Sequence, residues 1–360
     1  MNLYLSLVLI FLCCAFSALE LVTHRSYGMF CAILVALFVY IIAERNVYLV
    51  PDTGAYVENY ISTYADSEWS SIFSGGWGAG WNLFNLLCSK AGLHYRVFLG
   101  LIALIPCLMY FYAVHLLREN TYLGGGRCVT FSLWVGFWGL LWSGITLRVG
   151  MALPFAFLAH VLLLRKNYIK AALSFFIAYT FHSSIVVYPV FLFLSSRIKL
   201  EHKSYYIYGG VIILLWLVHV NRNLVEFLHV TLANILRLIA HNIPFLYRYS
   251  VYIGDVYDSF SSRKNFLFVV MMLFFAAIRP KNNPRFDHWL KFFAFNLAVT
   301  FPLGSFIIGY RVSDICLISA LPLIHNCVTS RKFSLDLRIL ICLGFIISMF
   351  IFSLRMTHVY

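Results

Sequence analysis

The sequence has little charge. Only 11% of its 360 residues are Asp, Glu, Lys or Arg, while 62% are hydrophobic and the mean hydropathy is +0.84. A soluble protein of this length and composition would expose large apolar patches, so we predict an integral membrane protein. Among the charged residues the acidic ones are fewer, 14 against 27 basic ones, but the basic residues form short clusters between apolar runs, as membrane-orientation signals do. We therefore expect a lipid bilayer and no nucleic acid as partner.

Several signatures of soluble enzymes are also missing. The chain has no CxxC pair, GxGxxG, Walker-type GK[ST] or HExxH motif, which removes the sequence support for nucleotide-driven and zincin chemistry. The nine cysteines fall almost entirely inside apolar runs, with Cys88 the clearest exception, so we expect neither disulfides nor a metal cluster. No Lys or Arg precedes Arg25, and we interpret the first apolar run as a retained span rather than a cleaved signal.

Apolar runs predict an all-α, polytopic protein that forms a single membrane domain over residues 1–360, with roughly twelve transmembrane helices. The runs cover about 3–19, 27–43, 97–117, 128–146, 149–164, 169–181, 185–196, 205–220, 265–279, 288–308, 312–328 and 337–354. Two of them, 169–181 and 185–196, are so short that they suit a re-entrant hairpin as well as two full crossings. Either choice leaves the sidedness of the other intervals unchanged.

The intervals between the runs alternate in charge. One set holds 16 of the 27 Lys and Arg residues and five acids, whereas the other holds 11 basic and nine acidic residues. By the positive-inside rule the first set is cytoplasmic. The second set then faces outward, together with both termini, the segments 44–96 and 221–264, and the turns at Arg148, His182 and Arg311.

The two long external segments have helical patterns of their own. In 44–96 we expect an exposed turn at residues 51–53, an amphipathic stretch through three tyrosines, a glycine-rich break at 75–80 and an apolar helix around 83–87. Segment 221–264 combines an amphipathic helix with a tyrosine-rich run. Both segments are expected to contribute to the outer surface.

Arg148, His182 and Arg311 interrupt apolar sequence on the predicted outer face. An arginine at the centre of a membrane helix costs about 2.5–3.5 kcal/mol on insertion scales, so such residues are read as functional. Guanidinium groups bind phosphate oxygens in pairs, and aromatic rings stack on sugars. The outer face therefore predicts a site for a lipid-linked saccharide. Further candidate contacts to sugar or phosphate are Tyr56, Arg248, Tyr249 and Tyr252.

Five short stretches resemble the EpsG family of Wzy-like polysaccharide polymerases of bacterial inner membranes. They are Asp52-Thr53-x-x-Tyr56, the Gly/Trp-rich stretch after it, residues 145–152 with Arg148, Phe181-His182-Ser183-Ser184, and Tyr310-Arg311. The resemblance covers about 50–325 and departs from the family at Gly78-Ala79-Gly80 and Val149, where members often carry Glu and Gln. Those departures leave the acceptor side of the site open.

The resemblance implies a polymerase that moves a growing glycan from undecaprenyl diphosphate to the terminal sugar hydroxyl of another lipid-linked repeat unit. The site would face the periplasm, and a chain-length regulator and a flippase would be partners. We expect Arg148 and Arg311 to hold the diphosphate and stabilise its developing charge. His182 is slightly favoured as the base because histidine titrates near neutral pH, with Asp52 as an orienting or alternative base.

We expect no cofactor and no metal, although Asp66-Ser67-Glu68 loosely fits a paired-acid motif and leaves a divalent cation open. Each candidate also has a structural explanation. The arginines could anchor helix ends in headgroups, His182 could be a packed histidine or helix cap, Asp52 could be an N-cap, and the tyrosines could belong to an interfacial belt.

Other functions compete with polymerisation. A flippase for lipid-linked oligosaccharide would have a similar number of spans, and an O-antigen ligase-like transferase or a glycosyltransferase using polyprenyl-phosphate sugars would also work at the outer face. The spans lack mid-helix acids and the polar groups gather on one side, which favours a one-sided enzyme over a transporter. The sequence leaves open the sugar, its linkage, the stereochemical outcome and the oligomeric state.

Overall fold

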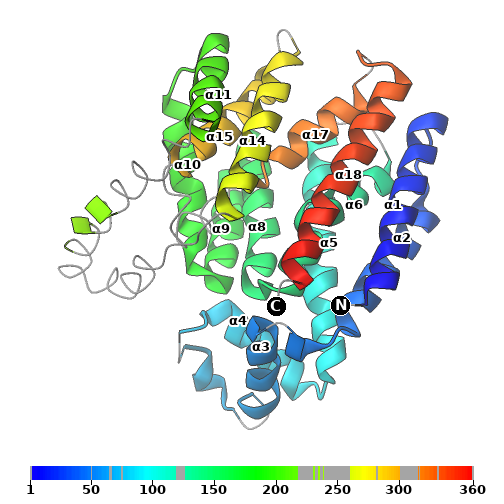
Figure 1. Cartoon of the computed structure of the whole chain (residues 1–360). Helices are drawn as coiled ribbons and strands as arrows, with labels where there is room; N and C mark the ends of the chain where they lie inside the picture. Colours follow the sequence, from blue (N-terminus) through cyan, green and yellow to red (C-terminus); the bar gives the residue numbers. More distant parts are fainter. Residues whose placement is uncertain are drawn as a thin grey trace. The chain divides into compact units, whose positions relative to one another are not determined.

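Every regular element in the described part of the computed structural model is a helix (Figure 1). The structure describes residues 2–49, 51–64, 67–73, 76–118, 126–217, 260–280, 283–300, 317–330 and 332–358, with isolated positions at 230–238 and 315. The chain divides into two compact units, which are described separately: unit 1 is Met1–Val186 with Ile324–Tyr360, and unit 2 is Val187–Leu323. The predicted all-α membrane fold is confirmed.

Four helices are long and apolar enough to cross a membrane. They are α1 (Leu3–Thr23), α5 (Tyr95–Arg118), α8 (Leu147–Leu164) and α18 (Leu335–His358). The remaining helices occupy the other predicted runs: α2 (Gly28–Ala43), α6 (Arg127–Trp134) with α7 (Leu140–Gly144), α9 (Tyr168–Phe181), α10 (Val187–Arg197), α11 (His202–Leu217), α14 (Phe260–Ala277), α15 (Pro284–Thr300) and α17 (Ala320–Thr329). A helix therefore occurs within every predicted apolar run, whether or not that helix crosses the whole membrane.

Unit 1 packs its helices around α5 and α8. Helix α5 contacts α2 and α8, α8 lies along α9, and α1 contacts α2, α6 and α18. Helices α6 and α7 are joined by the π-helical turn Val135–Gly139, which packs against α18. The core is aromatic, because apolar periodicity on several helices brings large rings together. Its ring pairs include Phe38, Tyr110, Phe131, Trp134 and Phe157.

A buried carboxylate fastens three helices at one end of unit 1. Helix α1 runs four residues beyond the predicted run and buries Glu20, whose oxygens accept hydrogen bonds from Tyr27 N at 2.9 Å and Val129 N at 3.0 Å. These are backbone donors at the starts of α2 and α6, where a helix leaves N–H groups without intrahelical partners. At the same end Arg118 donates to Gly126 O at 2.8 Å. All of these residues lie in or beside intervals predicted to be cytoplasmic.

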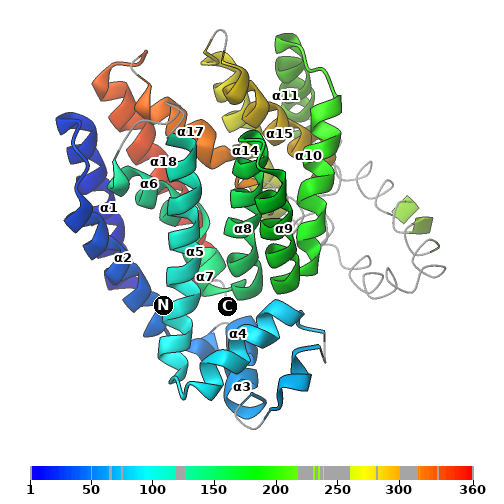
Figure 2. The same ribbon diagram turned by 180° about the vertical axis from the view of Figure 1, so that it is seen from behind.

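The segment 44–96 forms the other end of unit 1. It consists of a 3-10 turn (Val47–Leu49), α3 (Pro51–Ser62), a second 3-10 turn (Trp69–Phe73) and α4 (Ala79–Lys90). Both views show α3 and α4 below the lower end of α9 and beside the lower end of α5 (Figures 1 and 2). The two ends of unit 1 thus separate residues predicted to be cytoplasmic from those predicted to be external, as the charge alternation requires.

One expectation for this segment was wrong, and the predicted helix around 83–87 is present as α4. Residues 51–53 are not an exposed turn but the first turn of α3, because proline suits the first helical position and Thr53 is fully buried. In α4, Leu83 and Leu87 are 38% and 49% exposed, whereas Asn82 is buried. The amide is drawn inward because its Oδ1 accepts from Tyr64 OH at 2.7 Å and its Nδ2 donates to a backbone carbonyl.

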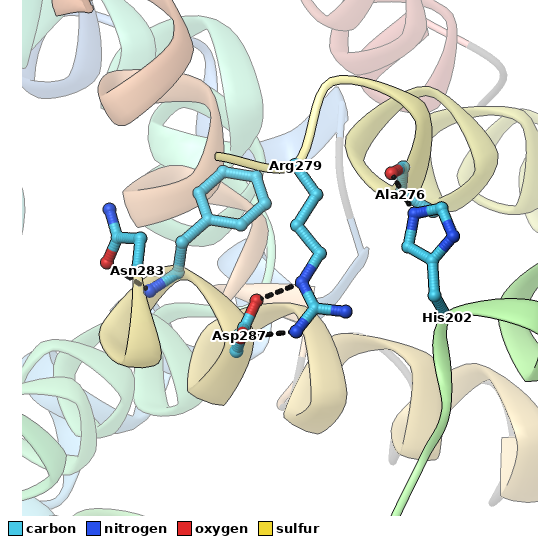
Figure 3. A network of polar contacts seen from close by, with 6 residues as sticks. His202, Ala276, Arg279, Asn283 and Asp287 are labelled. Carbon is cyan, nitrogen blue, oxygen red and sulfur yellow. Dashed lines mark hydrogen bonds and ion pairs between the residues drawn. The ribbon is translucent and has the colours of Figure 1, made fainter. Parts of the chain in front are cut away.

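Unit 2 contains α10, α11, α14, α15 and the start of α17. Helix α11 packs on α14, and α15 contacts α10 and α14. Figure 3 shows the polar network that joins three of these helices. Arg279 forms a two-point ion pair with Asp287, Nε2 of His202 lies 3.0 Å from Ala276 O, and Asn283 Oδ1 accepts from the N–H of Phe286 to cap α15. All these loops were predicted to be cytoplasmic.

Candidate functional site

Arg148 lies in the first turn of α8, where the chain turns between α7 and α8, and is half-buried. Its Nε donates to the hydroxyl of Tyr56 at 3.2 Å and its Nη1 to the carbonyl of Trp77 at 2.9 Å. The guanidinium carbon also stands 4.7 Å from the centre of the Trp77 ring, a cation–π distance. Protein groups therefore hold this guanidinium in place. An arginine that only anchors a helix end in lipid headgroups would not need such contacts.

The remaining N–H groups of Arg148 have no partner among the described residues, and no described carboxylate pairs with it. A guanidinium has five N–H donors in a planar fork that matches phosphate oxygens. Two of these donors hold the side chain in place, and the others have no partner in the described part of the chain. Such an arrangement suits the capture of an anion.

Tyr56 comes from the middle of α3 and is 8% exposed. Its ring meets Trp77 and Trp81 edge-on, with centroids 5.1 Å and 5.2 Å away. One helical turn earlier, Thr53 donates its hydroxyl to Gly144 O at 2.9 Å. Helix α3 thus uses one face to hold both Arg148 and the turn in front of it. The predicted role of Tyr56 as a ligand contact stays a prediction, since its visible contacts are with protein groups.

Two glycines bring the tryptophan stretch onto the end of α9. Gly78 has φ +98°, and a Cβ there would lie 2.6 Å from the backbone oxygen of Thr180. A Cβ on Gly80 would overlap the side chain of Thr180. Only residues without a side chain allow this approach. Because Arg148 binds Trp77 O and Thr180 lies two residues before His182, the contact brings the Arg148 turn and the His182 turn to one region.

We predict that Gly80→Ala and Gly78→Ala both reduce activity. Only the loss in Gly80→Ala should be partly reversed by a second substitution, Thr180→Gly. Thr180→Gly removes the atoms that a Gly80 Cβ would meet first, so the double variant should recover activity in part. It cannot rescue Gly78→Ala, whose clash is with backbone and whose φ disfavours a side chain. Activity and thermal stability of the purified variants measure this. Equal rescue of both glycine variants would contradict the proposed contact.

His182 ends α9 as its C-cap, with its backbone N–H bonded to Ala178 O at 3.1 Å. Its Nδ1 lies 2.5 Å from the hydroxyl of Ser184, which orients the ring. The helix-cap explanation thus describes the backbone of His182. The cap uses the backbone N–H of His182 and not its imidazole. The role of the side chain as a base therefore stays a prediction.

Asp52 is exposed in the first turn of α3 and lies one position inside the helix, because the helix begins at Pro51. Asp52 is therefore not the N-cap of α3, because it stands at the second helical position. Asp52 stands four residues before Tyr56, a spacing that places the two on neighbouring turns of one helix face. No described hydrogen bond or ion pair joins its carboxylate to Arg148.

Arg45, which no sequence pattern indicated as a site residue, is buried beside the same turn. Only 6% of it is exposed, and its Nη1 donates to Ser143 O at 2.6 Å. Its Nε and Nη2 have no hydrogen-bond partner in the described part of the chain. In sequence it looked like one more charge at a helix end, and no pattern distinguished it from the paired Arg96.

The remaining predicted residues, Arg311, Arg248, Tyr249, Tyr252 and the acid Asp66, lie outside the described residues. Segment 221–264 is outside for the most part as well, apart from isolated positions and the start of α14. Within the described part, no three or more His, Cys, Asp or Glu side chains gather where they could hold a metal ion. The eight described cysteines are free.

Comparison with known proteins adds the family. No curated protein and no solved structure matches the chain. The model of the EpsG family matches residues 28–360, which includes α3, the Gly78–Gly80 contact, Arg148, His182 and all of unit 2. The apolar helices and this family together indicate a membrane protein of polysaccharide biosynthesis, broadly a polymerase. With a match over nearly its whole length, the chain belongs to the EpsG family.

Proposed function

We propose that this protein is a Wzy-type glycosyltransferase at the outer face of a bacterial inner membrane. It transfers a growing glycan from undecaprenyl diphosphate to the terminal sugar hydroxyl of a lipid-linked repeat unit. The observation that carries the proposal is Arg148, a guanidinium fixed by Tyr56 and Trp77 with donors left over and no described acid beside it. A lipid diphosphate is an anion of suitable charge at a membrane surface.

In the proposed reaction the acceptor hydroxyl attacks the anomeric carbon of the growing chain. The bond between that carbon and the diphosphate oxygen breaks, and undecaprenyl diphosphate leaves with the electron pair. Arg148 stabilises the charge that develops on the leaving oxygen, together with Arg311 as the sequence predicts. His182, oriented by Ser184, accepts the proton of the acceptor hydroxyl, and Asp52 is the alternative base.

Aromatic side chains beside Arg148 support a saccharide ligand. The guanidinium lies over the rings of Trp77 and Tyr56, and Trp81 packs on Tyr56, so rings and charge occur together. Sugars next to a diphosphate present both apolar ring faces and an anion, which this combination suits. Glu20, the described acid within α1, is engaged by two backbone N–H groups, which gives it a structural role rather than one in transport.

The purified full-length protein, given undecaprenyl diphosphate-linked repeat unit alone, should produce a ladder of lipid-linked oligomers on a gel. A flippase would move the substrate across vesicles without elongating it, and a ligase would need a different acceptor and add one chain. A glycosyltransferase using monophosphate-linked sugars would ignore this donor. EDTA should leave the ladder unchanged. Substrate recovered without elongation, from folded protein, would disprove the proposal.

A further inference from the structure

Arg45 is a buried cation with no described counter-charge. It lies two residues beyond the end of α2 and is 6% exposed, with one hydrogen bond from Nη1 to Ser143 O. Its Nε and Nη2 have no partner in the described part of the chain, and neither ion pair described there includes it. Burial lowers the pKa of Arg45 to about 9, so the group still carries its charge at neutral pH.

The single hydrogen bond to Ser143 does not explain a guanidinium at this position. A neutral amide donor could reach a carbonyl equally well, without the cost of removing a charge from water. By contrast Arg96, on the same external segment, is half-exposed and pairs with Glu44 at 3.2 Å. The charge of Arg45 thus requires an explanation that its described contacts do not supply.

Arg45 and Arg148 flank one turn. Arg45 binds the carbonyl of Ser143, and Thr53 of α3 binds the next carbonyl, that of Gly144. Tyr56, one helical turn along α3 from Thr53, holds Arg148. Both arginines are therefore joined to the same short stretch of backbone, and neither forms an ion pair with a described acid.

A charge enclosed by protein acts over a longer distance than one in water, because the surrounding dielectric is low and salt screens it less. Two neighbouring cations repel one another until an anion binds between or beside them. The gain on binding grows with the charge of the anion. A diphosphate therefore benefits more than a monophosphate from the presence of Arg45.

We propose that Arg45 is a positioning residue that draws a lipid diphosphate into the Arg148 site through its buried charge, without touching the ligand. This inference rests on the proposed function and deepens it, since it assigns to Arg45 the preference for diphosphate over monophosphate. Arg148 makes the contact, and Arg45 sets the electric field in which that contact forms. The substrate class it selects is a lipid carrying two linked phosphates.

The test compares Arg45→Gln with Arg45→Lys in the full-length protein in detergent. Both replacements keep a donor for Ser143 O, but only lysine keeps the charge. Binding of inorganic pyrophosphate and inorganic phosphate is measured by calorimetry. We expect Arg45→Gln to lose about tenfold in pyrophosphate affinity, the order of one charge–charge interaction through space at an effective dielectric of about 20. Its phosphate affinity should fall less, and Arg45→Lys should stay within about threefold of wild type.

Three results would overturn the inference: wild-type protein that binds no pyrophosphate, unchanged affinity in Arg45→Gln, or equal losses in the Gln and Lys variants. The last would mean that the shape of the guanidinium matters and not its charge. If Arg45→Gln does not fold, Arg45→Met serves as a second neutral variant with the same expected loss. Arg96→Gln is the matched control, because its charge is already paired, and it should bind both anions as wild type does.

The same variants separate this inference from the proposed function. Wild-type protein that prefers pyrophosphate in an Arg45-dependent way but forms no ladder would retain the anion site and lose the polymerase proposal. A wild-type ladder with an Arg45→Gln enzyme of unchanged KM and unchanged pyrophosphate affinity would retain the polymerase and remove Arg45 from its site. A structural role alone would lower thermal stability without changing the ratio of the two affinities.

Discussion

Arg148→Ala is expected to abolish long polymer while single repeat units accumulate on lipid. The change removes the guanidinium that Tyr56 and Trp77 hold in place, and with it the donors proposed to stabilise the departing diphosphate. Loss of one such donor typically costs about 10²–10³-fold in rate. The rate is measured with purified protein and undecaprenyl diphosphate-linked repeat unit, and the polymer in cells on a gel.

Two controls make this result specific. Arg148→Lys keeps the charge but loses the planar fork and its stacking over Trp77, so its rate should lie between those of wild type and Arg148→Ala. Arg96→Gln, an arginine of the same external segment that pairs with Glu44, should leave the rate unchanged. If Arg148→Ala reaches the membrane in normal amount and still makes wild-type ladders, Arg148 is not part of the catalytic scheme.

His182→Gln is expected to lower turnover by about 10²–10⁴-fold, the range for removal of a general base. Glutamine keeps a polar group that can reach the Ser184 hydroxyl, so the turn after α9 should persist while proton transfer is lost. Binding of the donor lipid should change little, because Arg148 and not His182 is proposed to hold the diphosphate. The measurement is kcat and KM with purified lipid-linked repeat unit, alongside thermal unfolding.

Asp52→Asn is the matched variant for the alternative base. Asp52 is exposed one helical turn before Tyr56, so its neutral replacement should fold normally. If Asp52→Asn loses turnover and His182→Gln retains it, the roles assigned here are reversed. If the loss occurs in KM alone for either variant, that residue binds substrate and does not transfer the proton.

The sequence by itself determined the class of protein and the positions of its helices. Apolar runs must be helical in a bilayer, since lipid offers the backbone no hydrogen bonds, and helices occur at every predicted run. The charge of the intervals predicted which helix ends belong together. Contacts at the two ends of unit 1 agree, as Glu20 binds Tyr27 N at one end and Arg148 binds Trp77 O at the other. Short motifs around Arg148 and His182 also indicated the family.

Only the tertiary structure decided which groups hold the site together. Hydrophobic periodicity specifies that a helix face is buried but not which neighbour covers it, so the bond from Arg148 to Tyr56 had no signal in the sequence. In the sequence Gly78 and Gly80 indicated only a loop break. The structure shows that both must lack a side chain because Thr180 lies against them. The sequence could not distinguish Arg45 from Arg96, because whether an arginine is paired or buried alone depends on contacts with residues far away in the sequence.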